Sequence, residues 1–262
     1  MPKLCHLLVR DKADDRDYVY TLPHHHAHAA LPKRVDLRPK CAPVWNQGAI
    51  GTCTAHAVAA AFAYEQRIQK MRVIQPSRLF IFYNERALAG QLDRTPVLYL
   101  RDALKAVAKH GVCHESLWPY TEDPKKVKAK PPPDAFASAA KKRIFEYHRI
   151  RQSRRASMLL MHFKRCLADG SPVVFGIAVY ASFETDAVRR SGVMPIPDSK
   201  REEFKGGHAV MAVGYDDRRK AVLVRNSWGP KWGQDGHFWI PYKLITDSKL
   251  VHDFWTIRGV AS

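Results

Sequence analysis

A glycine-interrupted loop runs directly into an alanine-rich helical pattern in residues 47–64, QGAIGTCTAHAVAAAFAY. Gly48 and Gly51 break the backbone shortly before this pattern begins. We expect Thr52 to act as the helix N-cap and Cys53 to lie in the first turn. The unpaired amide groups and the positive end of the helix dipole favour a thiolate there. Cys53 is therefore a candidate nucleophile, although a cysteine before an alanine-rich run is also commonly a small buried core residue.

Length and composition indicate a globular protein. The chain has 262 residues, of which 46% are hydrophobic, enough for one large domain or two closely packed lobes. It contains no apolar run as long as a transmembrane helix. The apolar patch near its start is too short, and too soon followed by charges, for a secretory signal. We therefore expect a cytoplasmic protein.

The cysteines and histidines do not form a recognisable metal site. The five cysteines are odd in number and lack the spacing of zinc ligands or of a dense disulfide framework, so we expect reduced thiols. A histidine-rich tract near the start would bind a metal ion only weakly and without defined geometry. Its members are His24, His25, His26 and His28. The sequence therefore predicts neither a metal site nor a cofactor.

The formal net charge of +18 favours contact with polyanions. Basic residues occur along the whole chain and are densest in residues 141–165, but no recognised nucleic-acid-binding motif accompanies them. We expect weak, nonspecific attraction to polyanions and no specific nucleic-acid function.

The first part of the chain is predicted to be helical. Ser77 is a candidate N-cap for a buried helix, RLFIFYNERAL. The amphipathic pattern YLRDALKAVAKHG ends at Gly111, a candidate C-cap. The stretch WPYTEDPKKVKAKPPPD loses periodicity, and Pro131, Pro132 and Pro133 exclude a helix or a central strand there.

The second half changes to β-character. A short helix (DAFASAAKK), a strand (RIFEYHRIR) and a helix closed by Gly170 (ASMLLMHFKRCLADG) come first. Segments rich in Val, Ile and aromatic residues follow, namely PVVFGIAVY, HAVMAVGY, AVLVRNSW and HFWIPY. They predict an antiparallel sheet or partial barrel, so the fold class is α+β with a site in the crevice between the two parts.

Two motifs in the β-rich half carry candidate catalytic residues. GGHAVMAVGYD places His208 at the start of a strand, and VRNSWGPKWGQDGHFWI places Asn226 at the end of one. Each alone is open to a structural explanation, as a satisfied core histidine or a turn-forming asparagine. Together with the Cys53 loop, and in the same order, they resemble the papain-like cysteine peptidases over residues 31–257. The compact chain looks most like the prokaryotic branch of that family.

The resemblance implies a two-lobe papain-like fold with four catalytic residues in its cleft. Cys53 would be the nucleophile that forms an acyl-enzyme, and His208 its general base and acid. Asn226 would hold the imidazole by its side-chain oxygen without titrating. The side-chain amide of Gln47, with the backbone N–H of Cys53, would stabilise the oxyanion.

The same resemblance implies substrate-binding residues and shows where this cleft departs from the animal and plant members. Trp228 would shield the contact between histidine and asparagine, and Gly207 and Leu98 would line the cleft. Val97 and Leu98 replace a glycine pair that holds extended substrates. Ile50 replaces a disulfide cysteine, and Thr54 replaces the tryptophan after the nucleophile.

We therefore predict three parts: an N-terminal extension (residues 1–30), a helical lobe with the nucleophile (31–122) and a β-rich lobe with His and Asn (123–262). The expected function is a cysteine peptidase restrained by residues 1–30 covering part of its cleft, an endopeptidase in the leading interpretation and an aminopeptidase in another. The alternative is a papain-like scaffold that binds an anionic ligand, such as a nucleotide or nucleic acid, with little proteolysis. The oligomeric state is left open.

Overall fold

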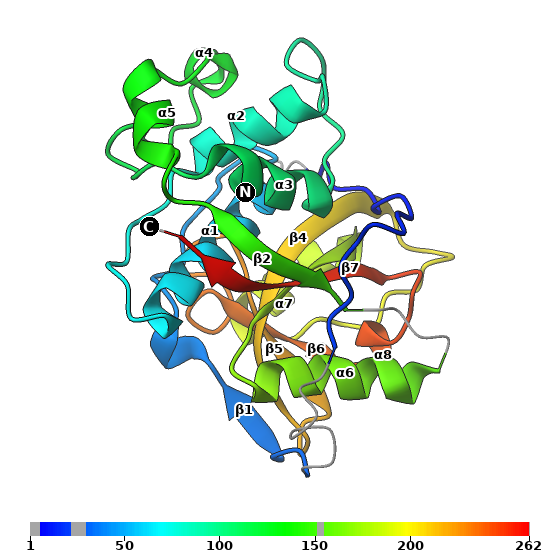
Figure 1. Ribbon diagram of the computed structural model, residues 1–262. Coiled ribbons are helices and arrows are strands. Elements are labelled where there is room, and N and C mark those ends of the chain that lie inside the picture. Colours follow the sequence, from blue (N-terminus) through cyan, green and yellow to red (C-terminus); the bar gives the residue numbers. More distant parts are fainter. Residues whose placement is uncertain (1–5, 22–29, 151–154, 262) are drawn as a thin grey trace.

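Helix α1 (Cys53–Ile68) lies between the other helices of the first half and a large antiparallel sheet (Figure 1). The computed structural model describes residues 6–21, 30–150 and 155–261. Residues 53–66 of α1 are all buried, because its many alanines allow neighbours to pack closely on every side. The helix that begins at the candidate nucleophile is thus the centre of the first core.

The remaining helices follow the chain around this centre. They are α2 (Arg78–Leu88), α3 (Leu100–His110), α4 (Pro124–Lys128), α5 (Pro133–Ala139), α6 (Ala156–Ala168), α7 (Asp186–Ser191) and α8 (Tyr242–Ile245), with 3₁₀ turns at Arg38–Lys40 and Ala181–Glu184. In Figure 1, α2 to α5 gather at one end of the molecule, and α6 lies at the other. None of the helices in the described residues is long and apolar enough to cross a membrane.

The sheet has seven strands in the order β2-β7-β3-β4-β5-β6, with β1 paired to β4. All its pairings are antiparallel, and it does not close into a barrel. The strands are β1 (Arg34–Asp36), β2 (Ile144–Arg149), β3 (Val173–Tyr180), β4 (Phe204–Asp216), β5 (Ala221–Arg225), β6 (His237–Pro241) and β7 (Val251–Val260). The predicted α+β class is confirmed.

Two buried apolar clusters hold the fold together. The first joins α1, α2 and α3 to the inner face of β4 and β7, and includes Trp255. The second lies between the sheet and α6, and includes Phe163 and Phe175. Phe136 of α5 packs on Phe80 of α2 with ring centroids 4.9 Å apart, so residues just after 122 contact the helical side. The domain boundary at residue 122 stays a prediction.

Two helix ends agree with the sequence. The Ser77 hydroxyl accepts the Phe80 N–H at 3.2 Å at the start of α2. Gly111 ends α3 with a φ of 75°, which favours glycine. Thr52 is the N-cap residue of α1, as predicted, but its side chain makes no capping hydrogen bond. Its hydroxyl lies 2.7 Å from the Tyr120 hydroxyl instead of accepting a helix N–H.

The sequence misjudged the proline-rich stretch and one strand. α4 occurs where a helix was excluded, because Pro124 occupies the first helical position, where a missing N–H costs nothing. α5 coincides with most of the predicted short helix DAFASAAKK and begins one residue earlier, at Pro133. Asp123 caps α4 by accepting the Lys125 N–H at 2.9 Å. β7 was not predicted, since its sequence VHDFWTIRGV mixes charges with apolar residues. The histidine tract at 24–28 lies outside the described residues.

Candidate active site

His208 and Asn226 meet because β4 and β5 are hydrogen-bonded neighbours in the sheet. Asn226 directly follows β5, and its Oδ1 lies 2.8 Å from Nε2 of His208. The Trp228 ring stacks on the His208 ring at a centroid distance of 4.9 Å and an angle of 30°. His208 and Asn226 are buried, Trp228 is partly buried, and the amide oxygen holds the imidazole in one orientation.

Cys53 is the first residue of α1, as predicted, and is fully buried. The backbone groups of Ala209 and Thr54 hydrogen-bond to its sulfur and favour the charged form. Since Ala209 directly follows His208, this contact places the thiol beside the strand that carries the histidine. Burial outweighs these bonds and raises the pKa of Cys53 to about 12.

His208 is held neutral in this arrangement. Burial lowers its pKa to about 3, and the nearby charge of His6 lowers it further, while the bond to Asn226 acts in the opposite sense. Nδ1 of His208 is buried and has no hydrogen-bond partner among the described residues. Thiol and imidazole therefore coexist here as a neutral pair.

Gln47 joins the nucleophile loop to the end of β5. Its Oε1 accepts the Ser227 hydroxyl at 2.5 Å, and its backbone N–H donates to the Ser227 carbonyl at 2.8 Å. Its Nε2 donates to the carbonyl of Ile50 at 2.9 Å, which uses one of two N–H groups and leaves the other available. Gln47 thus lies between the cysteine loop and Asn226, and its oxyanion role stays a prediction.

Residues 6–9, here called the cleft segment, run between two of the predicted substrate-binding residues. The Leu8 N–H donates to the Gly207 carbonyl at 3.3 Å. The Val9 N–H donates to the Leu98 carbonyl at 2.9 Å, and the Leu98 N–H donates to the Leu7 carbonyl at 3.0 Å. This last pair makes a parallel bridge between Leu8 and Leu98. Gly207 and Leu98 therefore bind an extended peptide, which in this structure belongs to the chain itself.

The side chains of the cleft segment fill the site. Leu8 is buried, and a Cβ on Gly176 would meet both its Cδ2 at 2.8 Å and the His252 ring. A Cβ on Gly207 would collide with the Leu8 carbonyl, so only glycine permits this approach. The imidazole of His6 reaches Glu184, with Nε2 2.8 Å from Oε1. The sequence placed residues 1–30 over the cleft but singled out neither Leu8 nor His6; the short apolar run LLV was the available signal.

A buried ion network anchors the chain just after the cleft segment. The Asp11 N–H donates to Asp253 Oδ2 at 2.6 Å. Asp17 pairs with Arg101 of α3 at 2.6 Å and with Arg149 of β2 at 2.8 Å, and Arg149 also pairs with Asp253 at 2.6 Å. Residues 11–17 are thereby tied to both halves of the molecule.

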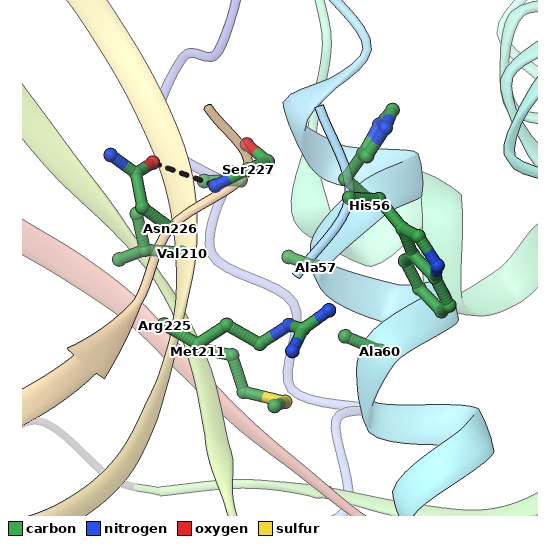
Figure 2. Close-up of a pocket in the computed structure, with 10 residues that line it drawn as sticks. His56, Ala57, Ala60, Val210, Met211, Arg225, Asn226 and Ser227 are labelled. Carbon is green, nitrogen blue, oxygen red and sulfur yellow. Dashed lines mark hydrogen bonds between the residues drawn. The ribbon is translucent and has the colours of Figure 1, made fainter. Parts of the chain in front are cut away.

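Arg225 is another buried cation close to the site. Figure 2 shows the Arg225 side chain extending from the end of β5 toward Ala57 and Ala60 of α1, beside a cavity of about 10 Å³. That volume has room for about one water molecule. The guanidinium donates to the carbonyls of Ala42 at 2.6 Å and Pro43 at 2.5 Å. Arg225 therefore ties residues 42–43 to the end of β5.

Thr54, which replaces the family's tryptophan, faces the helical core. Its hydroxyl donates to Glu85 Oε1 on α2 at 2.9 Å, and both side chains are buried. Burial raises the pKa of Glu85 well above its usual range, so this carboxyl group is neutral. Within the described residues, no three His, Cys, Asp or Glu side chains are grouped as metal ligands.

The chain matches known proteins along most of its length. The family model described as papain family cysteine protease matches residues 31–250. An uncharacterized peptidase C1-like protein from Acanthamoeba polyphaga mimivirus is 39% identical over 231 residues, which cover 87% of this chain and 73% of that protein. Chymopapain from Carica papaya is 27% identical over 229 residues, which cover 86% of this chain and 57% of the relative.

A solved structure agrees with these matches. Xylellain, a cysteine protease from Xylella fastidiosa, superimposes with a TM-score of 0.88 at 40% sequence identity, covering 98% of this chain and 96% of that one. The similarity to this bacterial protein agrees with the predicted prokaryotic branch. None of the matches supports the alternative of a papain-like binding protein. The chain belongs to the papain family of cysteine proteases.

Proposed function

We propose that the chain is a cysteine endopeptidase whose own cleft segment restrains it. The observation that carries the peptidase assignment is the 2.8 Å contact between His208 Nε2 and Asn226 Oδ1. It commits one imidazole nitrogen to the amide and leaves Nδ1 for the thiol of Cys53. A buried imidazole next to a cysteine at a helix start is suited to form a thiolate–imidazolium pair once the site is hydrated.

In the proposed reaction the same groups act first in acylation and again in deacylation. The Cys53 thiolate attacks the carbonyl carbon of the scissile peptide bond, and the resulting oxyanion is stabilised by the Cys53 backbone N–H and the free N–H of Gln47. His208 gives its proton to the leaving amine, and the acyl-enzyme forms. Water, deprotonated by the same imidazole, then releases the acid and regenerates the thiol.

The path of the cleft segment supports endopeptidase over aminopeptidase activity. His6 lies against the rings of His208 and Trp228, and Val9 bonds to Leu98 further along the cleft. An extended chain therefore passes the catalytic histidine and continues beyond it. A cleft that accommodates the chain on both sides of the catalytic pair suits an internal peptide bond.

The restraint rests on burial as well as on occupancy. Cys53 and His208 are both fully buried with the cleft segment in place, which favours the neutral forms of both. A neutral thiol is a poor nucleophile, so the covered site cannot begin the reaction. Undocking of residues 6–9 would admit water and substrate together.

The test compares three full-length variants on a library of internally quenched peptides. Leu8→Glu places a charge in an apolar contact and should raise kcat/KM at least about tenfold over the unmodified chain, since an uncompensated buried charge is strongly unfavourable. Val9→Glu, at a position that is 38% exposed, is the matched control and should change little. Cys53→Ala should abolish turnover. Absence of Cys53-dependent cleavage in a folded Leu8→Glu variant would refute the peptidase assignment. Equal activity with and without Leu8→Glu would refute only the restraint.

The attraction to polyanions is proposed on charge alone. The chain's net charge of +18 predicts retention on a polyanionic resin that weakens steeply with salt. Retention unaffected by salt would contradict this electrostatic origin.

A further inference from the structure

A groove of about 960 Å³ opens beside the cleft on the helical side. Its walls are the loop before Cys53, the second half of α2, residues 92–96 and the region of α4. Its apolar lining includes Leu7 of the cleft segment, Ile50 and Phe82. The groove is therefore continuous with the track that the cleft segment follows.

Most of the charged side chains that line this groove are basic. Arg86, Arg94, Lys128 and Lys130 line it, and Asp93 is the acidic residue among the described lining residues. Across residues 6–21, 30–150 and 155–261, no carboxylate forms an ion pair with Arg94, Lys128 or Lys130. Three cations thus face the groove with their charge uncompensated.

Arg86 is a fixed part of the wall. It is 4% exposed, and its guanidinium donates to the carbonyls of Phe82 at 3.2 Å and Val127 at 2.8 Å. These bonds hold a positive charge between α2 and α4. The carboxylate of Glu122 accepts the Ala49 N–H at 2.8 Å beside the groove, and the four basic residues outnumber Glu122 and Asp93. The groove therefore presents a preformed positive potential to a ligand.

The cleft segment shows how a peptide would reach this groove. Successive side chains of an extended strand point to opposite sides, so Leu7 lines the groove while Leu8 faces Gly176 and His252. A substrate that follows the same track along Leu98 must also direct alternate side chains toward the groove.

We propose that this groove binds acidic side chains of a peptide substrate that lies along Leu98. This inference rests on the proposed peptidase function and names its substrate class. An apolar side chain of the substrate suits the part of the groove beside Ile50 and Phe82. Glutamate or aspartate residues suit the part beside the basic side chains.

The test uses two peptides that differ only in Glu or Gln at the residues on both sides of the scissile bond. Their kcat/KM values are measured with full-length Leu8→Glu protein, and their Kd values with the full-length double variant Leu8→Glu, Cys53→Ala. We expect the Glu peptide to be favoured about tenfold in both measurements, since each half-exposed charge pair contributes a few-fold. The preference should shrink in about 0.5 M salt, because screening weakens such pairs.

Charge-reversal variants test whether the groove causes the preference for the Glu peptide. Lys128→Glu with Lys130→Glu should abolish or invert the preference. Lys125→Glu with Lys141→Glu changes the net charge equally at exposed positions outside the groove and should preserve it. Equal values for the two peptides, or equal loss of preference in both double variants, would overturn the groove assignment. Cleavage of the Gln peptide, lost in Cys53→Ala, reports the peptidase function separately from this outcome.

Discussion

The imidazole of His6 lies edge-on against the imidazole of His208, with their ring centroids 5.6 Å apart. Trp228 covers another side of the same ring, and Asn226 holds its Nε2. The catalytic histidine is thereby enclosed, and an imidazolium would face both burial and the charge of His6. The cleft segment therefore disfavours the active ionisation state in addition to filling the site.

The first prediction concerns the reactivity of Cys53 at mildly acidic pH. With the cleft segment docked, the pKa of Cys53 is raised to about 12 and that of His208 is lowered to about 3, so alkylation by iodoacetamide at about pH 6 should be slow. In His6→Ala the rate at this pH should rise several-fold, because the imidazolium loses a repulsive neighbour. An unchanged rate would show that His6 acts only by occupying space.

A second prediction follows from the buried carboxylate of Asp11. Burial and the charge of Asp253 raise the pKa of Asp11 to about 6. A raised pKa means that the protonated form favours docking, so this contribution is present below the undocked value of 3.8 and is lost as the pH rises through about 6. Limited proteolysis of residues 6–21 should therefore accelerate between about pH 4 and pH 7.

The variant Asp11→Asn separates this effect from other titrations. Asp11 accepts the Trp255 Nε1–H at 2.9 Å and the Arg101 backbone N–H at 3.2 Å, and an amide can accept only on its one oxygen. The informative quantity is therefore the slope with pH and not the absolute rate. The pKa of His208 is lowered while the cleft segment is docked, so its protonation in the undocked state weakens docking as the pH falls below about 6.5. This effect is opposite to that of Asp11. A slope preserved in Asp11→Asn would assign the pH dependence to another group.

The third prediction concerns stability at the interface of α1 and α2. Glu85 is buried and neutral, and its Oε2 has no hydrogen-bond partner among the described residues. Because its folded pKa is raised, its contribution to stability is lost as the pH rises. Glu85→Gln keeps an acceptor for the Thr54 hydroxyl and cannot ionise, so its Tm should match the unmodified protein in acid and exceed it in alkali. Thermal unfolding across the pH range checks this, and a lower Tm at every pH would contradict it.

The fourth prediction concerns the orientation of the catalytic histidine. Asn226→Ala, introduced with Leu8→Glu, should lower kcat about a hundredfold with little change in KM, because a misplaced base acts on the chemical step. Asn226→Asp retains an oxygen toward His208 Nε2 and should recover part of the rate, with a shifted pH profile. A change confined to KM would argue against a positioning role.

The catalytic motifs and most elements could be predicted because their signals are local. Ser77 marks the start of α2, Gly111 the end of α3, and Cys53 lies at the start of α1 as its loop indicated. The short helix at Pro124 was excluded because proline was weighed as a helix breaker, although it is well tolerated at the first helical position.

The remaining features depend on contacts between distant residues. The hydroxyl of Thr52 contacts Tyr120, and the carboxylate of Asp11 contacts Trp255, at sequence separations that no local pattern encodes. Strand β7 is stabilised by pairing with β2 and β3, which permits a charged residue such as Asp253 within it. The sequence alone therefore could not identify which residues cover the site.

The most direct test is site-resolved labelling of all five cysteines by mass spectrometry with a thiol-directed epoxide. The unmodified full-length chain is compared with Leu8→Glu and with the exposed control Val9→Glu. We predict that Leu8→Glu accelerates modification of Cys53 at least about tenfold, while rates at the other cysteines and in Val9→Glu stay unchanged. Slow, uniform labelling of all cysteines in every variant would contradict both the nucleophile and its restraint by the cleft segment.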